Sequence, residues 1–93
     1  MKIIAVCGMG IGTSVLLKMN AEKVLEVLGV TAEVQAADIA KAKREGHSAD
    51  IILTTPELVY QLEAMPGKVI SIDHVFDLAE IKQKLSAAIG EPS

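Results

Sequence analysis

Residues 3–14 read IIAVCGMGIGTS and contain the only cysteine of the 93-residue sequence. The apolar run over residues 2–6 predicts a short buried strand that ends just before Cys7. Three glycines then alternate with single side chains, and two hydroxyl residues open a pattern typical of an amphipathic helix. This order of strand, thiol, glycine-rich loop and helix start predicts an anion-binding pocket around a sulfur nucleophile.

The physical basis of that pocket is the backbone of the loop. We expect Gly8, Gly10 and Gly12 to let successive N–H groups turn inward, because glycine has no Cβ to clash. The first turn of the following helix would add unpaired N–H donors and the positive end of its dipole. A thiol in that field should have a lowered pKa and react as the thiolate.

The composition narrows the class of protein. A hydrophobic content of 51% with one Phe, one Tyr and no Trp predicts an aliphatic core in a single domain over residues 1–93. One cysteine allows no internal disulfide and disfavours a cysteine-framed zinc site, so we expect a reducing, cytoplasmic location, no metal and no bound cofactor. The net charge of −3 gives no reason to expect nucleic acid, and no apolar run approaches the ~20 residues of a membrane helix.

Strands and helices alternate along the rest of the chain. Each expected helix has a start or stop signal, such as Thr13 or Ser14 as the N-cap of the first and Gly29 after its end. Asp38 should cap the second helix, Thr55-Pro56 should start the third and Asp77 the fourth. The expected strands are residues 2–6, 31–37, 51–54 and 69–72, and the expected helices are residues 14–28, 38–44, 56–65 and 78–89.

This alternation predicts an α/β fold with a four-stranded parallel sheet in the order 2-1-3-4 and helices on both faces, a three-layer Rossmann-like or flavodoxin-like architecture. Ligands of such sheets bind beyond the carboxyl ends of the strands, where Cys7 would lie. Other polar side chains should reach the same edge from strands 2, 3 and 4, namely Asp38, Thr54, Thr55, Asp73 and His74.

Several known phosphate loops can be compared with this one. The dinucleotide fingerprint G-x-G-x-x-G fails from either Gly8 or Gly10, and the Walker motif needs a lysine that is absent before Thr13. The spacing from Cys7 to Ser14 equals that of the low-molecular-weight tyrosine phosphatase loop. That family has arginine where this chain has Thr13, and it uses an Asp-Pro general acid that this chain lacks. We therefore expect a phosphatase-like loop that accepts phosphate on sulfur and passes it on rather than releasing it to water.

In these residues, especially Ala5 to Gly8 and Gly10 to Ser14, the chain resembles the enzyme IIB components of the bacterial sugar phosphotransferase system, of the ascorbate type within the lactose/galactitol-like class. The resemblance implies a phosphotransferase whose Cys7 takes a phosphoryl group from phosphohistidine on a IIA component. Cys7 would then pass it to a sugar held by the membrane-embedded IIC transporter. Met9 departs from the polar residue expected in ascorbate-type members, which leaves the sugar open.

The candidate site thus consists of Cys7 as the nucleophile and a phosphate-binding segment made of Gly8, Met9, Gly10, Ile11, Gly12, Thr13 and Ser14. Thr13 and Ser14 could bind phosphoryl oxygens, cap the helix, or both. The apolar Met9 and Ile11 could form a docking surface for IIA and IIC, or fold back onto the core. His74 could act in the chemistry or be a plain loop histidine. His47 has a weaker case, Tyr60 is expected to pack or to cap a helix, and the basic residues 41–44 are expected to form a solvated helix face.

Two other kinds of function stay open at this point. One is a cysteine phosphatase or arsenate reductase, although the first would lack its arginine and the second a resolving cysteine. The other is a regulatory domain that binds an anion without covalent chemistry, in which case Cys7→Ser would keep its function.

Overall fold

The computed structural model describes residues 1–7 and 10–89, and of residues 10 and 11 only the backbone. Within these ranges four strands alternate with helices, as the sequence predicts. The strands are β1 (Lys2–Val6), β2 (Glu33–Ala37), β3 (Ile51–Thr54) and β4 (Lys68–Ser71). The helices are α1 (Gly10–Leu28), α2 (Ile39–Glu45), α3 (Val59–Leu62) and α4 (Leu78–Ala88), with 3-10 turns η1 (Gly46–Ser48) and η2 (Pro56–Leu58).

All four strands form one parallel sheet in the order β2-β1-β3-β4, which confirms the predicted topology. The central strand β1 aligns Ile4 with Gln35 of β2 on one side and with Ile52 of β3 on the other. The carboxyl ends of the strands therefore meet at one edge of the sheet, and Cys7 follows β1 at this edge.

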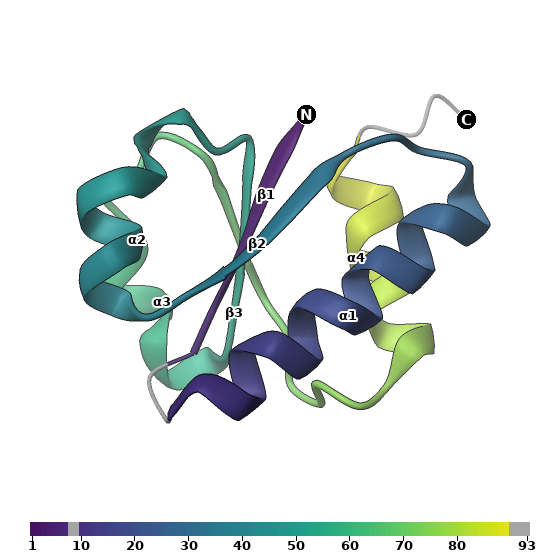
Figure 1. Ribbon diagram of the computed structural model, residues 1–93, viewed down its shortest axis with the longest axis horizontal. Helices are drawn as coiled ribbons and strands as arrows, with labels where there is room; N and C mark the ends of the chain where they lie inside the picture. Colours follow the sequence, from purple (N-terminus) through teal and green to yellow (C-terminus); the bar gives the residue numbers. More distant parts are fainter. Residues whose placement is uncertain (8–9, 90–93) are drawn as a thin grey trace.

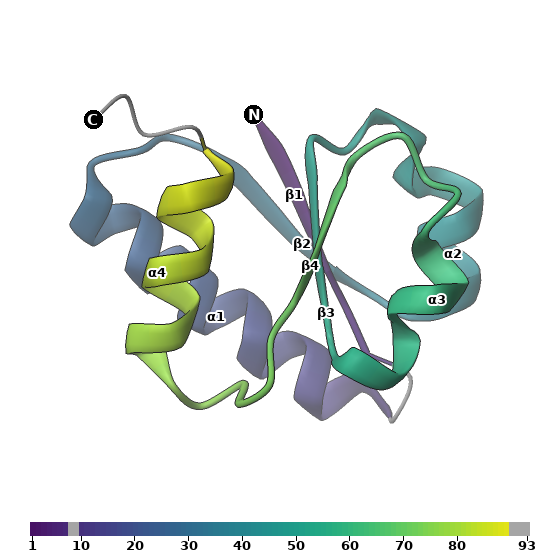
Figure 2. The same cartoon turned by 180° about the vertical axis from the view of Figure 1, so that it is seen from behind.

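Helices cover both faces of the sheet and complete the three layers. Figures 1 and 2 show α1 and α4 on one face and α2 and α3 on the other. Successive side chains of a strand point to opposite faces, so β1 contributes to both cores. Ile3, Ala5 and Cys7 belong to the aliphatic cluster under α1 and α4, and Ile4 and Val6 belong to the cluster under α2 and α3.

The start of α1 differs from the prediction. The helix begins at Gly10, four residues before Ser14, so Thr13 and Ser14 lie inside it and neither is its N-cap. Ser14 is buried, as is Leu17 one turn later. Packing of this side of the helix overrides the capping preference of the hydroxyl residues, because propensity is the weaker of the two effects.

The third predicted helix is also shorter than expected. Thr55 makes no side-chain cap bond, and the segment divides into the 3-10 turn η2 and the single turn of α3. Only Leu62 of α3 is buried, so little packing is available to extend regular helix beyond it.

Three of the predicted helix signals are confirmed. Gly29 has a φ of 72°, the left-handed conformation that glycine adopts most readily. The Asp38 carboxylate accepts a hydrogen bond from the Lys41 backbone N–H at 2.7 Å. Asp77 accepts from the N–H groups of Ala79 and Glu80, at 3.0 and 3.2 Å, and so caps α4. None of the helices among the described residues is both long enough and apolar enough to cross a bilayer.

Candidate active site

Cys7 is held between the ends of three strands. Its backbone N–H donates to the Ala37 carbonyl of the β2 end, with an N···O distance of 3.4 Å. On the other side, the buried Thr54 hydroxyl at the end of β3 donates to the Val6 carbonyl at 2.9 Å. The cysteine is thereby fixed in position at the edge where α1 begins three residues later.

The Cys7 side chain is buried, with 3% of its surface exposed, in the aliphatic cluster that also contains Leu17 and Ile72. Burial raises the pKa of the Cys7 thiol, because the charged thiolate loses water. The negative charge of Glu57, on η2, raises it further. The expectation of a lowered pKa is therefore wrong for this conformation, since desolvation prevails over the field expected from the loop and helix start.

The predicted phosphate-binding segment is only partly described. Gly8 and Met9, one of the two proposed docking residues, lie outside the described residues, and so does the side chain of Ile11. The backbone from Gly10 onward forms the first turns of α1 rather than a loop. The first N–H groups of a helix have no partner within it, so this turn can supply donors to an anion.

Gly12 is an exposed position in this first part of α1. Among the described residues, apart from its chain neighbours and the nearby helix backbone, a Cβ built at Gly12 would have no atom within 4 Å, and its φ is not in the left-handed region. The fold therefore does not need glycine here. Thr13, the position of the arginine in the phosphatase loop, is half-buried and Ser14 is buried.

A second group of polar residues is found on the loop between β4 and α4, at the same edge of the sheet. Glu80 of α4 reaches back to this loop, where its two carboxylate oxygens accept from the N–H groups of Asp73 and His74 at 2.6 and 2.9 Å. The His74 ring Nδ1 is 3.3 Å from Glu80 Oε1. Asn20 of α1 donates to the Val75 carbonyl at 2.7 Å, so the loop is held from both helices.

Glu80 is the charged group at the centre of this loop support. Burial alone would raise the pKa of Glu80, but hydrogen bonds from Lys84, Asp73 and His74 outweigh it and lower the pKa to about 2. Lys84 Nζ lies 2.8 Å from Glu80 Oε2 and donates to the Ser71 carbonyl at 2.6 Å. The hydrogen bond to Glu80 raises the pKa of Lys84 in turn.

His74, Asp77 and Glu80 also bring their ligand atoms within 4.8 Å of one another, which would be close enough to hold a cation. Both Glu80 oxygens already accept hydrogen bonds, and the Lys84 ammonium occupies the position beside one of them. The cluster is therefore explained by its role in holding the loop.

The chain matches, over residues 2–87, the family described as "PTS system, Lactose/Cellobiose specific IIB subunit". The protein belongs to this family. The match agrees with the resemblance carried by Cys7 and the glycines that follow it, and IIB subunits work in general with IIA and IIC partners.

A curated relative supports the same assignment, and two solved structures share the fold. The ascorbate-specific PTS system EIIB component of Mycoplasma pneumoniae is 40% identical over 88 residues, covering 94% of this chain and 93% of that protein. The lactose-specific IIB domain of Streptococcus pneumoniae shares the fold, with a TM-score of 0.64, 14% identity and coverage of 96% and 90%. YwlE of Bacillus subtilis, an arginine phosphatase, shares it with a TM-score of 0.55, 18% identity and coverage of 95% and 90%.

The roles of four residues near this edge of the IIB subunit were not predicted from the sequence, which indicated Glu80 only as part of a capping box with Asp77. Glu57 acts on the thiol through its charge, and Asn20, Glu80 and Lys84 hold the loop after β4. The spacing of Glu80 and Lys84, four residues apart on one helix, is a signal that could have indicated their pairing. No local pattern connects Asn20 with Val75, because 55 residues separate them.

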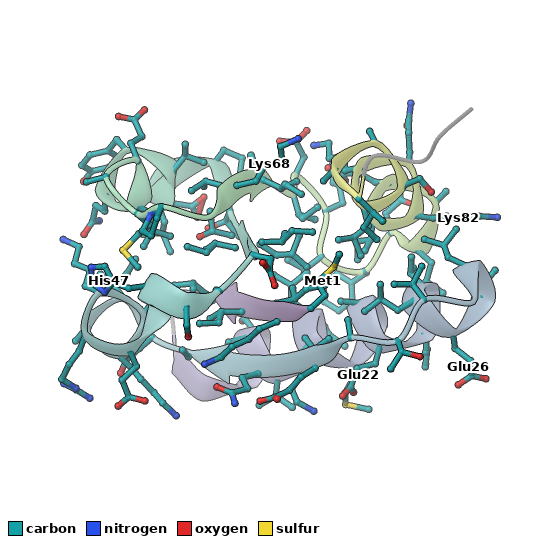
Figure 3. All side chains as sticks on the ribbon, turned by 90° about the horizontal axis from the view of Figure 1, so that it is seen from above. Met1, Glu22, Glu26, His47, Lys68 and Lys82 are labelled. Carbon is teal, nitrogen blue, oxygen red and sulfur yellow. The ribbon has the colours of Figure 1, made fainter. Side chains whose placement is uncertain are left out.

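The remaining candidates lie on the surface. Tyr60 is predicted to pack or to cap a helix; it is 70% exposed, so the expectation that it packs is wrong, and its hydroxyl accepts from the Gln61 amide at 3.4 Å. His47 is exposed on η1 (Figure 3). Lys41, Lys43 and Arg44 are exposed on α2, as predicted for a solvated helix face.

Proposed function

We propose that Cys7 is the phosphoryl carrier of this IIB subunit. It would accept the group from phosphohistidine on a IIA component and deliver it to a sugar held by the IIC transporter. The observation that carries this proposal is the place of Cys7 directly after β1, at the carboxyl edge of a parallel sheet and three residues before the start of α1. Ligands bind at this edge in open α/β sheets, and a helix start favours phosphate.

The chemistry has two balanced steps. In the first, Cys7 Sγ attacks the phosphorus atom, the P–N bond to the IIA histidine breaks, and the thiol proton passes to the leaving imidazole nitrogen. In the second, a sugar hydroxyl attacks the same phosphorus atom, the S–P bond breaks, and the hydroxyl proton passes to the sulfur. No step needs a cofactor, because the residues only position the groups and stabilise charge on the transferring oxygens.

The burial of Cys7 has a consequence for the first step. A covered, protonated thiol does not react with a phosphohistidine on another protein, so Cys7 must become exposed when IIA docks. The raised pKa keeps the proton on sulfur until then, and this proton is available to the imidazole leaving group. Docking would therefore trigger the reaction, and the free subunit would be protected from oxidation.

Hydrolysis is the competing fate of a phosphocysteine. The single arginine of the sequence is Arg44, which is exposed on α2 and pairs with Glu45 at 3.6 Å. The arginine position of the phosphatase loop is occupied by Thr13. Without a bidentate arginine clamp on the phosphoryl oxygens, transfer to water should be slow. This favours a carrier over a phosphatase of the YwlE fold.

The sugar is proposed to be ascorbate or a related sugar or sugar alcohol. This rests on the ascorbate-specific relatives, among them the Mycoplasma pneumoniae protein that is 40% identical over nearly the whole chain. The choice is tested by transport of labelled ascorbate into cells that express the matching IIC transporter, with and without this subunit.

The main experiment is intact-mass measurement of the subunit after incubation with phosphorylated IIA. The wild-type chain should gain one phosphoryl group, and Cys7→Ser should gain none. An adduct that is stable to hydroxylamine but is removed by iodine is assigned to sulfur. An equal adduct on Cys7→Ser would reject Cys7 as the carrier. The same samples with p-nitrophenyl phosphate should show no appreciable turnover, and steady turnover would favour the phosphatase.

A substitution at Gly12 tests whether the first turn of α1 binds the phosphoryl group. Gly12→Ala should stabilise α1 by about 1 kcal/mol, because alanine is the better helix former and the Cβ meets nothing. If the first turn of α1 cradles the phosphoryl group, the same methyl should slow loading of Cys7. Gain of stability with loss of loading supports the cradle, and unchanged loading contradicts a close approach at Gly12.

A further inference from the structure

The loop of residues 73–77, between β4 and α4, carries Phe76, the only phenylalanine of the chain. The Phe76 side chain is 76% exposed. Single exposed apolar residues are common on protein surfaces, so exposure alone decides nothing. Phe76 is distinguished by the hydrogen bonds that hold the backbone of the loop on both sides of it.

The backbone of this loop is fixed on both sides of Phe76. Asp73 and His74 donate their N–H groups to Glu80, and the Val75 carbonyl accepts from Asn20. The Asp77 N–H donates to the His74 carbonyl at 2.9 Å, and the Asp77 side chain caps α4. A large aromatic side chain is thus held outward on a rigid loop, which reduces the entropy that binding would otherwise cost. Aromatic residues in such positions dominate the energy of protein interfaces.

The charge around this aromatic residue is negative. Residues 73–77 contain two aspartates and no lysine or arginine. With Glu80 they give three carboxylates against one ammonium, that of Lys84, which lies 3.7 Å from Asp73 Oδ2. An exposed carboxylate, Glu57, also follows the end of β3, the strand that pairs with β4. Figures 1 and 2 show the loop at the end of the sheet where β1 and β3 also terminate. A partner that covers Phe76 should therefore present an apolar pocket with basic side chains around it.

The cytoplasmic loops of membrane proteins carry an excess of lysine and arginine. A IIB subunit has two protein partners, IIA and IIC. Of these, the membrane-embedded IIC transporter is the one whose cytoplasmic surface is as a rule basic, as a partner of this loop should be. We propose that the loop of residues 73–77, with Phe76 as its anchor, docks on the basic cytoplasmic face of the IIC transporter. This inference rests on the proposed function, since it concerns the protein that receives the phosphoryl group.

The test measures binding and transfer separately. Inverted membrane vesicles from cells that express the IIC transporter are mixed with the subunit in a Cys7→Ser background, and bound protein is measured by sedimentation. Phe76→Ala should weaken binding by about 30-fold or more, because central aromatic anchors contribute at least ~2 kcal/mol. Tyr60→Ala is the matched control, since Tyr60 is the other aromatic residue and is similarly exposed. It should bind within about twofold of the parent.

Charge provides a second readout. Asp73→Asn should weaken vesicle binding less than Phe76→Ala, and added salt should weaken binding of the parent more than binding of Asp73→Asn. Equal binding of Phe76→Ala and its parent, or equal loss in Tyr60→Ala, would overturn the proposal. So would equal binding to vesicles that lack the transporter, which would indicate lipid as the partner.

Loading from phosphorylated IIA, with Cys7 present, separates this proposal from the proposed function. Phe76→Ala should load with an unchanged KM for IIA and deliver phosphate to the sugar with a raised KM for the vesicles. A raised KM for IIA with unchanged vesicle binding would assign the loop to the donor and overturn the proposal. If wild-type Cys7 does not load at all but Phe76→Ala still loses vesicle binding, the carrier function fails and the docking surface stands.

Discussion

The two helical layers that cover the sheet differ in size and in what they support. On one face, α1 and α4 have 19 and 11 residues, whereas α2 and α3 on the other have 7 and 4. Cys7 belongs to the core beneath the longer pair. Asn20, Glu80 and Lys84, which hold the loop of residues 73–77, also come from the longer pair. The comparison indicates that Cys7 and the loop of residues 73–77 rest on the layer with the longer helices, the thicker layer, while the thinner layer mainly covers the other face of the sheet.

The largest effect should come from cavities in the two cores. Leu85→Ala in α4 should lower the free energy of unfolding by about 3–5 kcal/mol, and Leu62→Ala in α3 by about 2–3 kcal/mol. Both leucines are fully buried, but the single turn of α3 can move inward more easily than α4 can. Urea unfolding followed by far-UV circular dichroism measures both values. A greater loss from Leu62→Ala would show that the thinner layer is the more rigid one.

The sequence predicts the strand order and several of the helix caps well. The topology follows from four apolar strands separated by helical patterns, and the caps at Gly29, Asp38 and Asp77 are visible as local signals. The start of α1 could not be predicted in this way, because burial of Ser14 decides it. The prediction of a lowered pKa for the Cys7 thiol is wrong for a related reason. Its pKa depends on which side of β1 faces the larger core, and the glycine motif carries no information about that.

Glu80→Gln should have the next largest effect, about 1.5–3 kcal/mol, since hydrogen bonds to a charged group are lost and Lys84 keeps only its longer ion pair with Asp73, at 3.7 Å. The pH dependence has a definite sign. The pKa of Glu80 is lowered to about 2 from an ordinary value near 4.3, so its stabilisation is complete above about pH 5 and is lost as the pH falls toward 2. The difference between wild type and variant in urea unfolding should therefore shrink between pH 6 and pH 2. A constant difference would contradict the charged role of Glu80.

Helix caps give a smaller effect that compares the layers directly. Asp77→Ala at α4 and Asp38→Ala at α2 should each cost about 1 kcal/mol. The loss should be larger at Asp77, which accepts from two N–H groups where Asp38 accepts from one. Asparagine at either position is the control and should recover most of the stability. Equal stability of the alanine and asparagine variants would mean that the side-chain caps contribute nothing.

The smallest effect concerns the thiol itself. Glu57→Gln should shift the pH profile of Cys7 alkylation by iodoacetamide to lower pH, because one of the two causes of its raised pKa is removed. Alkylation should stay slow at neutral pH in both proteins, since burial is the larger cause and is unchanged. Glu63→Gln, another exposed carboxylate, should leave the profile in place. An equal shift in both variants would indicate a general charge effect.

The exposure of both aromatic side chains affects how this protein can be observed in solution. Near-UV circular dichroism needs aromatic rings fixed in an asymmetric, packed environment, but Tyr60 and Phe76 both lie at the surface and the chain has no tryptophan. A fully ordered sample should therefore show strong far-UV ellipticity and almost none above 250 nm, which is the spectrum usually assigned to a molten globule. For this protein, dispersed methyl resonances and failure to bind ANS are the appropriate evidence of a well-packed interior.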